Sequence, residues 1–160
     1  MFSHIIPGQE LAPLVDRDMD WQSKGDLVLF DQKEFVSALY VWDTSSMDDL
    51  GYVYIPHECR KDGANCKVHV GIHGCEQGRN KIDDTFVKNA GYLEWAASNN
   101  LIVLFPQAKT NTLNPKGCWD FWGYTGGDYA SSLGVQPSAI HKMVERLQTK
   151  SSSDDLKFIY

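Results

Sequence analysis

The chain has 160 residues, a length that fits one domain and is sufficient to bury a hydrophobic core. Hydrophobic residues make up 42% of it and charged residues 22%, which is typical of a globular protein. The formal net charge of −6 argues against nucleic-acid binding, and no apolar run approaches the length of a membrane span. The first ten residues lack the basic and apolar regions of a signal peptide, so none is predicted in this chain.

The predicted elements begin after an irregular N-terminal segment, residues 1–26, and residues 27–160 form one domain. Apolar runs bounded by turn residues predict strands in this domain. In chain order the predicted strands are residues 27–30, 51–55, 66–72, 101–105 and 156–160. The run at 101–105 is apolar without interruption, which is typical of a strand buried on both faces of a sheet.

Apolar residues recur at helical spacing in two other parts of the chain. Residues 80–98 carry them at intervals that predict a helix with one buried face. Pro137 marks the start of a second predicted helix, because proline is favoured in the first helical turn. The order of strands and helices is that of an α/β protein.

Four cysteines, Cys59, Cys66, Cys75 and Cys118, allow three different disulfide pairings. None forms a C-x-x-C pair, which argues against a zinc ribbon, and the sequence predicts no metal site and no cofactor. Cys59 and Cys66 flank a short polar loop and can close a small ring, which would leave the other two to pair over a long range. Two disulfides and four reduced thiols both remain open on these grounds.

The first candidate motif, His73-Gly74-Cys75, follows the predicted strand at 66–72 directly. A strand that ends in His-Gly can build an oxyanion hole, where a fixed backbone N–H stabilises the negative charge formed during acyl transfer. Gly74 permits a sharp turn, and the donor would be the N–H of Cys75 or of a neighbour. The motif alone is weak evidence, and His73 fits a structural role better than that of a catalytic base.

The second candidate motif lies in a long predicted loop, residues 108–134, in which aromatic residues follow Cys118. Loops of this length are functional or disordered, and a high aromatic content argues against disorder. Aromatic side chains at a pocket mouth would form a wall for an acyl chain or a polyester. A small satellite core is the alternative interpretation. The residues concerned are Trp119, Phe121, Trp122 and Tyr124.

A nucleophile elbow of the form G-x-S-x-G is absent from the sequence. The nearest segment is Ser131-Ser132-Leu133-Gly134, which follows Ala130 and does not match the motif. The spacing of the histidines and aspartates indicates no triad base or partner. The sequence therefore predicts part of an acyl-transfer site without its nucleophile.

Several stretches together resemble extracellular poly(3-hydroxybutyrate) depolymerases and related esterases. Each stretch is short, but their order and spacing over residues 27–149 carry the resemblance. The stretches are residues 51–56 with Cys59, 66–70 with 73–75 and Gln77, 86–92 with 94–96, 102–108, 114–115 with 117–120, and 134–136. The resemblance implies part of an α/β-hydrolase fold, a three-layer sandwich with a mostly parallel sheet.

In one branch of that family the strand order is circularly permuted, so that the segment with the Ser, Asp and His comes first. This chain resembles the other part, the C-terminal half. The resemblance implies that Cys75 supplies an oxyanion-hole N–H and that Trp119 and its aromatic neighbours face the substrate. It also implies disulfides between Cys59 and Cys66 and between Cys75 and Cys118. In an alternative arrangement, residues 156–160 form the strand before an elbow that lies beyond Tyr160.

Three hypotheses about function follow. The chain is part of a serine esterase that hydrolyses a hydrophobic ester or polyester through an acyl-enzyme. Alternatively, it is a non-catalytic polymer-binding remnant. In the third hypothesis it is a subunit that needs a complementary chain or self-associates through an uncovered sheet edge. The resemblance implies an extracellular or periplasmic location, and we expect no esterase turnover from the chain alone.

Overall fold

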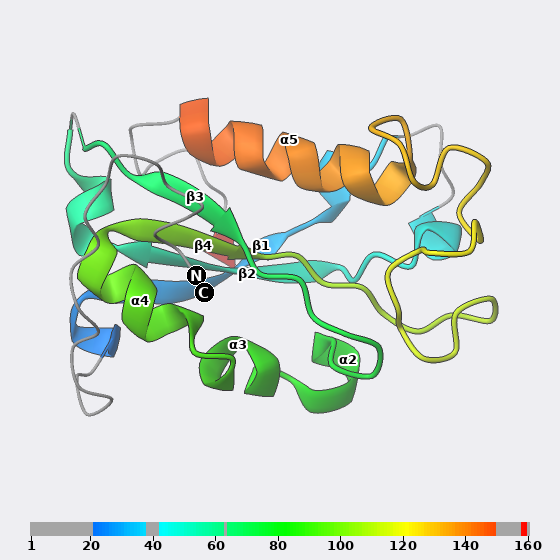
Figure 1. Cartoon of the computed structure of the whole chain (residues 1–160), viewed down its shortest axis with the longest axis horizontal. Helices are drawn as coiled ribbons and strands as arrows, with labels where there is room; N and C mark the ends of the chain where they lie inside the picture. The colour runs from blue at the N-terminus through cyan, green and yellow to red at the C-terminus, as the bar shows by residue number, and fades with distance from the viewer. Residues whose placement is uncertain (1–20, 38–41, 63, 150–157, 160) are drawn as a thin grey trace.

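The computed structural model describes residues 21–37, 42–62, 64–149 and 158–159. Its centre is a five-stranded sheet in the order β3-β4-β2-β1-β5 (Figure 1). The strands are β1 (Gly25–Asp31), β2 (Leu50–Pro56), β3 (Lys67–Val70), β4 (Leu101–Phe105) and β5 (Phe158–Ile159). All five predicted strands are therefore confirmed, although residues 156, 157 and 160 of the last one lie outside the described residues.

The sheet is mixed and mostly antiparallel, so the expectation of a mostly parallel sheet was wrong. β1 pairs antiparallel with both β2 and β5, and β2 pairs antiparallel with β4. The described parallel pair is β3 with β4. A parallel connection needs a long crossover, which the helices between β3 and β4 provide, whereas the helical elements described between β1 and β2 are short 3-10 turns.

The predicted helix over 80–98 is broken into three, and the predicted final helix is confirmed. Asp83 has φ 53° and Gly91 has φ 80°, and both values end a right-handed helix. Pro137 lies in the first turn of α5, as expected. The helices are α2 (Arg79–Ile82), α3 (Thr85–Asn89), α4 (Tyr92–Asn99) and α5 (Val135–Thr149), and the 3-10 turns are η1 (Trp21–Ser23), η2 (Lys33–Phe35), η3 (Trp42–Ser45) and η4 (His57–Arg60).

Helices cover both faces of the sheet, which gives the expected three layers (Figure 1). On one face, Ala139 and Met143 of α5 pack into a core cluster with strand residues. On the other, Leu93 and Ala96 of α4 pack into a second cluster. All five residues of β4 are buried, as its apolar sequence predicts.

The proposed domain division at residue 26 stays a prediction, because residues 1–20 lie outside the described residues. Within the described part, no helix has the length and apolar character needed to cross a membrane.

Candidate functional site

Residues 73–78, here called the His-Gly loop, follow β3 and lead into α2 at the carboxyl end of the parallel strand pair (Figure 1). Within this loop the Gly74 N–H donates to Oε1 of Gln77 at 2.8 Å. The Cys75 N–H donates to no acceptor among the described residues. An oxyanion hole requires a fixed backbone donor of this kind, aimed at the position where charge develops.

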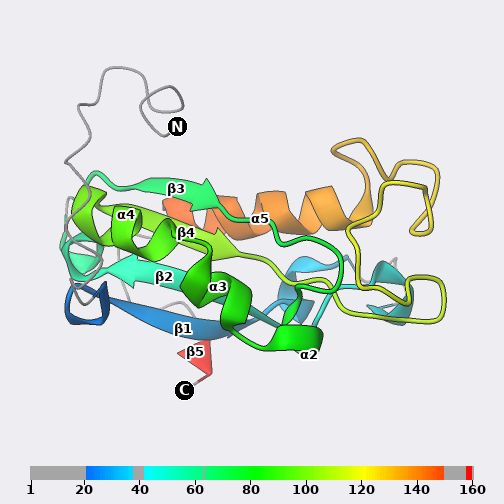
Figure 2. The same ribbon diagram turned by 60° about the horizontal axis from the view of Figure 1, so that its bottom comes forward.

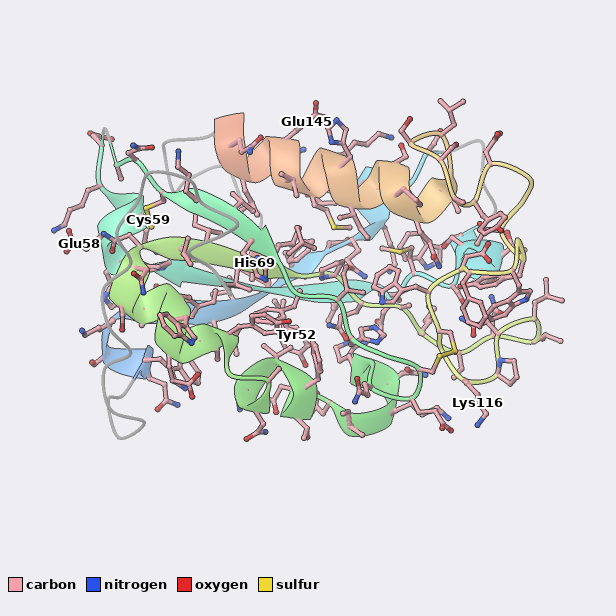
Figure 3. All side chains as sticks on the ribbon, viewed as in Figure 1. Tyr52, Glu58, Cys59, His69, Lys116 and Glu145 are labelled. Carbon is pink, nitrogen blue, oxygen red and sulfur yellow. A yellow bond between two sulfur atoms is a disulfide. The ribbon has the colours of Figure 1, made fainter. Side chains whose placement is uncertain are left out.

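Three connections hold the His-Gly loop against residues 114–119. A disulfide joins Cys75 to Cys118. The Glu76 N–H donates to the carbonyl oxygen of Lys116 at 2.7 Å, and Nε1 of Trp119 donates to the carbonyl oxygen of His73 at 3.1 Å. Figure 3 shows this disulfide beside Lys116. The loop backbone is thus fixed on both sides of Cys75.

The second disulfide joins Cys59 to Cys66, and the described residues contain no free cysteine. Both pairings implied by the family resemblance are therefore confirmed. The Cys59–Cys66 bond closes the polar turn before β3, at the opposite end of that strand from the His-Gly loop.

His73 is almost fully buried and both its ring nitrogens are engaged. Nδ1 lies 2.7 Å from the carbonyl oxygen of Gly74, and Nε2 lies 3.0 Å from the N–H of Ala108. Since Nε2 must accept from that N–H, the proton is assigned to Nδ1, which donates to Gly74. Burial lowers the pKa of His73 below its usual value, which favours the neutral ring. This histidine connects the loop to the segment after β4 and has no free nitrogen for general-base catalysis.

A network of buried polar side chains lies under the His-Gly loop, and the sequence interpretation missed it. Asp48 is 1% exposed and accepts a hydrogen bond from Nη2 of Arg79 at 2.6 Å. Oε1 of Gln107 accepts the N–H of Arg79 at 2.8 Å, and Gln32 bonds the backbone N–H and carbonyl of Gln107. These contacts fix the start of α2, where the loop ends. A single sequence does not show which glutamines are buried, so only the structure identifies them.

Gly78 allows the close packing at this end of the loop. A Cβ atom there would lie 2.4 Å from the carbonyl oxygen of Ala108 and 3.1 Å from the His73 ring. Any larger residue would push the loop away from the segment after β4. The approach of these two segments therefore depends on a glycine.

Residues 119–134, here called the aromatic loop, contain the four predicted wall residues. These four side chains differ in how far they are buried. Trp119 and Tyr124 are partly buried and hydrogen-bonded. The Trp119 ring lies 5.4 Å from that of His73. The Tyr124 hydroxyl donates to the Cys118 carbonyl oxygen at 2.9 Å and accepts from Nε2 of Gln136 at 2.8 Å. These two rings belong to the scaffold as well as to the surface.

Phe121 and Trp122 are exposed at 70% and 46%, and their rings form an edge-to-face pair at 4.6 Å. The Asp120 carboxylate holds the backbone beneath them. It accepts N–H groups from residues 122–125 and the hydroxyl of Thr125 at 2.7 Å. Partial burial acts to raise the pKa of Asp120, but the hydrogen bonds from Thr125, Gly123 and Trp122 outweigh it and lower the pKa.

Asn114 holds Cys118, the residue that the disulfide joins to Cys75 of the His-Gly loop. The residue is fully buried. Its Oδ1 accepts the Cys118 N–H at 2.9 Å, and its Nδ2 donates to the Cys118 carbonyl oxygen at 2.7 Å and to Oγ of Ser46 at 3.0 Å. The Asn-Pro dipeptide was the available signal, but it predicts a turn rather than a buried hub.

Among the described residues, the hydrogen bonds and ion pairs of the serines and histidines do not link a serine, a histidine and an acid as a catalytic triad. Oγ of Ser131 donates to the Asp128 carbonyl oxygen. His141 pairs with Glu145 at 3.3 Å, and both side chains are exposed. No group of three or more potential metal ligands gathers within the described part of the chain.

The chain is similar in sequence to two polyester depolymerases. It is 37% identical over 126 residues to the poly(3-hydroxybutyrate) depolymerase of Delftia acidovorans. It is 36% identical over 117 residues to the polyhydroxybutyrate depolymerase of Talaromyces funiculosus. The matches cover 78% and 66% of this chain but 24% and 34% of those proteins. No protein-family model matches the chain.

Two solved structures resemble the fold. The PHB depolymerase from Penicillium funiculosum has a TM-score of 0.74 and 31% identity, covering 85% of this chain and 43% of that one. A serine-to-alanine variant of a PHB depolymerase, complexed with an R3HB trimer, has a TM-score of 0.68 and 33% identity, covering 77% of this chain and 40% of that one.

The mixed sheet with helices on both faces is of the α/β-hydrolase type. The chain belongs to a poly(3-hydroxybutyrate) depolymerase-like family. It spans less than half the length of the relatives it matches.

Proposed function

We propose that this chain is the oxyanion-bearing portion of a polyester hydrolase, equivalent to the C-terminal half of a circularly permuted depolymerase. The observation that carries the proposal is the Cys75 N–H, which has no acceptor among the described residues on a loop fixed by a disulfide and by His73. The similarity to depolymerases supports a hydrophobic polyester as the substrate.

The residues of this chain would contribute positioning and charge stabilisation rather than the nucleophile. The Cys75 N–H would donate to the oxyanion of the tetrahedral intermediate, and loss of such a donor costs about 10²–10³ in kcat. Trp119, whose Nε1 is bonded to the same loop, would form the apolar wall beside the reacting carbonyl. The serine, its base and its acid would come from the complementary portion, and the ester would be cleaved through an acyl-enzyme.

The test is to measure hydrolysis of p-nitrophenyl butyrate by the purified chain, alone and together with a complementary polypeptide. That polypeptide is the portion of the Talaromyces funiculosus depolymerase that this chain does not match. We expect no turnover from the chain alone, and turnover blocked by a serine-directed inhibitor from the mixture. Inhibitor-sensitive turnover by the chain alone would contradict the proposal, as would an assembled mixture with no activity.

A second candidate function, binding to solid polyester, is favoured by the exposed side chains of Phe121 and Trp122. Leu133 of the same loop is 70% exposed. Depletion of the chain from solution by PHB granules tests this function. We expect the Phe121→Ala/Trp122→Ala variant to bind less, while Ile72→Ala, which removes an exposed apolar side chain elsewhere, binds as the wild type does. Equal binding by all three would exclude the aromatic loop as the adsorbing surface.

The two disulfides support an oxidising location, because such bonds persist outside the reducing cytosol. An extracellular or periplasmic location agrees with a substrate that is a solid polymer.

A further inference from the structure

Arg79, the first residue of α2, holds the end of the His-Gly loop through two hydrogen bonds. Its backbone N–H donates to Oε1 of Gln107 at 2.8 Å, and its Nη2 donates to Oδ1 of Asp48 at 2.6 Å. Asp48 precedes β2 and Gln107 follows β4. α2 lies at the same end of the sheet as these two segments (Figure 2). One residue therefore connects the end of the loop to both segments.

The two partners of Arg79 belong to a closed set of hydrogen bonds with Gln32, here called the buried platform. The Asp48 N–H donates to the carbonyl oxygen of Gln107 at 2.9 Å. Nε2 of Gln32 donates to the carbonyl oxygens of both Asp48 and Gln107, and its Oε1 accepts the Gln107 N–H at 2.9 Å. All three platform residues are buried. Because these bonds do not involve Arg79, the platform is a support to which the loop is attached.

The His-Gly loop is attached to this end of the sheet on both sides of the proposed oxyanion donor. At its start, Nε2 of His73 accepts the N–H of Ala108. Just after its end, Arg79 bonds to the buried platform. Cys75 lies between these attachments, and its disulfide to Cys118 holds it from another direction. A change at either attachment would therefore shift the backbone that carries the Cys75 N–H.

The burial of Asp48 explains why this position takes an arginine. A buried carboxylate has lost its water and needs a cation or several hydrogen bonds. Oδ1 of Asp48 accepts from Arg79 and, at 3.3 Å, from the Leu50 N–H, while Oδ2 has no hydrogen-bond partner among the described residues. The cation that pairs with Asp48 in the described part of the chain is Arg79. The attraction therefore ties a fixed anion to the end of the loop.

We propose that Arg79 is a positioning residue, which fixes the end of the His-Gly loop through Asp48 and Gln107 and so sets the position of the Cys75 N–H. This inference rests on the proposed function, in which that N–H stabilises the oxyanion. Arg79 acts through the loop backbone, so its loss should lower kcat and leave KM unchanged.

The first experiment measures hydrogen exchange in the full 160-residue chain, without a partner or a substrate. Arg79→Met removes the charge and the side-chain donors. We expect the Gly74 and Glu76 amides, which are bonded within and beside the loop, to exchange about tenfold faster. The Gln107 amide, bonded to Gln32 within the platform, should keep its rate.

Two further variants separate the ion pair from a general loss of stability. Asp48→Asn removes the same pair without leaving an unpaired buried charge, so it decides the question if Arg79→Met does not fold. Arg146→Met is the matched control, because the Arg146 side chain is 31% exposed, against 30% for Arg79, and pairs with Glu34 elsewhere. This control should leave the exchange of the loop amides unchanged.

The second experiment measures ester hydrolysis by the mixture with the unmatched portion of the Talaromyces funiculosus depolymerase. Arg79→Met should lower kcat about tenfold or more with KM unchanged, because even a small displacement of a catalytic group is costly. Arg79→Lys keeps the charge and should recover part of the loss. Arg79→Met should cost less in the Asp48→Asn background than in the wild type, since the pair is already absent there.

The outcomes distinguish this inference from the proposed function. Loop exchange that neither Arg79→Met nor Asp48→Asn changes would overturn the inference, as would an equal rise at the Gln107 amide. A fall in kcat that Arg79→Lys does not recover at all, or a loss confined to KM, would also overturn it. Faster loop exchange in a chain whose mixture never hydrolyses ester would count against the proposed function alone.

Discussion

The His-Gly loop and the aromatic loop share one anchor, Cys118, yet they differ in what holds them. The His-Gly loop is fixed from below by buried polar groups, with both nitrogens of His73 bonded to backbone. The aromatic loop is held at its base by the Asp120 carboxylate, while the rings of Phe121 and Trp122 face outward. The contacts of the His-Gly loop fix its backbone atoms in place. The contacts of the aromatic loop leave these two rings exposed to solvent.

This difference corresponds to two tasks in the proposed function. An oxyanion donor must keep its position to within a fraction of an ångström, because its contribution depends on preorganisation. A surface that meets an apolar polymer needs exposed area more than exact direction. The contrast predicts that substitutions at or next to Cys118 disturb the backbone of both loops, whereas substitutions within one loop disturb that loop only.

Removal of the Cys75–Cys118 disulfide should have the largest effect on stability. This bond spans 43 residues, for which loop-closure entropy gives about 4 kcal/mol of unfolding free energy. The Cys59–Cys66 bond spans 7 residues and should contribute about 2 kcal/mol, which makes its removal the matched control. Urea unfolding of the two double-alanine variants measures both losses. Equal losses would show that the long-range bond restrains the unfolded chain no more than the short-range bond does.

Asn114→Ala should have the next largest effect, about 3 kcal/mol, because it leaves the buried Cys118 N–H and carbonyl without this partner. The substitution should raise amide exchange in both loops, since Asn114 holds Cys118, which precedes the aromatic loop and is disulfide-bonded to the His-Gly loop. Thr112→Ala is the control, because Thr112 is an exposed polar residue close by in the same segment. Faster exchange confined to one loop would argue against a shared anchor.

The strands and the final helix were predictable because continuous apolar runs and proline placement are local signals. The direction of the sheet was not, because β1 and β2 are apolar in the same way whether they pair parallel or antiparallel. The long helical pattern also concealed its breaks, since Asp83 adopts a positive φ that nothing in the spacing of apolar residues indicates.

The candidate site was predictable only where a short motif carries chemistry. His73, Gly74 and Cys75 stood out because a strand ends in His-Gly. The buried groups that hold this loop, Gln107 and Asn114, did not stand out, because amides are common and their burial depends on tertiary contacts. The aromatic residues were identified as a group, but the sequence did not distinguish the anchored rings from the exposed ones.

His73 should make the chain less stable in mild acid. Its folded pKa lies below the unfolded value of about 6.5, so the unfolded chain binds the proton first. The stabilising contribution is complete above that pH and is lost as the pH falls below it, by at most about 1.4 kcal/mol per pH unit. Urea unfolding at several pH values should show a smaller acid loss in His73→Gln than in the wild type.

Two comparisons isolate the His73 effect. Burial also lowers the pKa of His69, which adds a loss of the same sign, so the wild type must be compared with each single variant. His141→Gln is the exposed control and should leave the acid loss unchanged. An identical pH dependence in His73→Gln and the wild type would contradict the neutral, doubly bonded ring.

The smallest effect is expected for Asp120→Ala, about 1 kcal/mol, because this carboxylate is partly exposed and solvent screens its interactions. Its folded pKa is lowered, so its contribution is present above the unfolded value of about 3.9 and is lost as the pH falls through the folded value. Amide exchange at residues 122–125 should rise, while the Glu76 amide, bonded to Lys116, stays protected. Asp128→Ala, at an exposed position of the same loop, should change neither. Loss of protection at Glu76 in Asp120→Ala would show that the two loops are one mechanical unit and that the contrast between them is false.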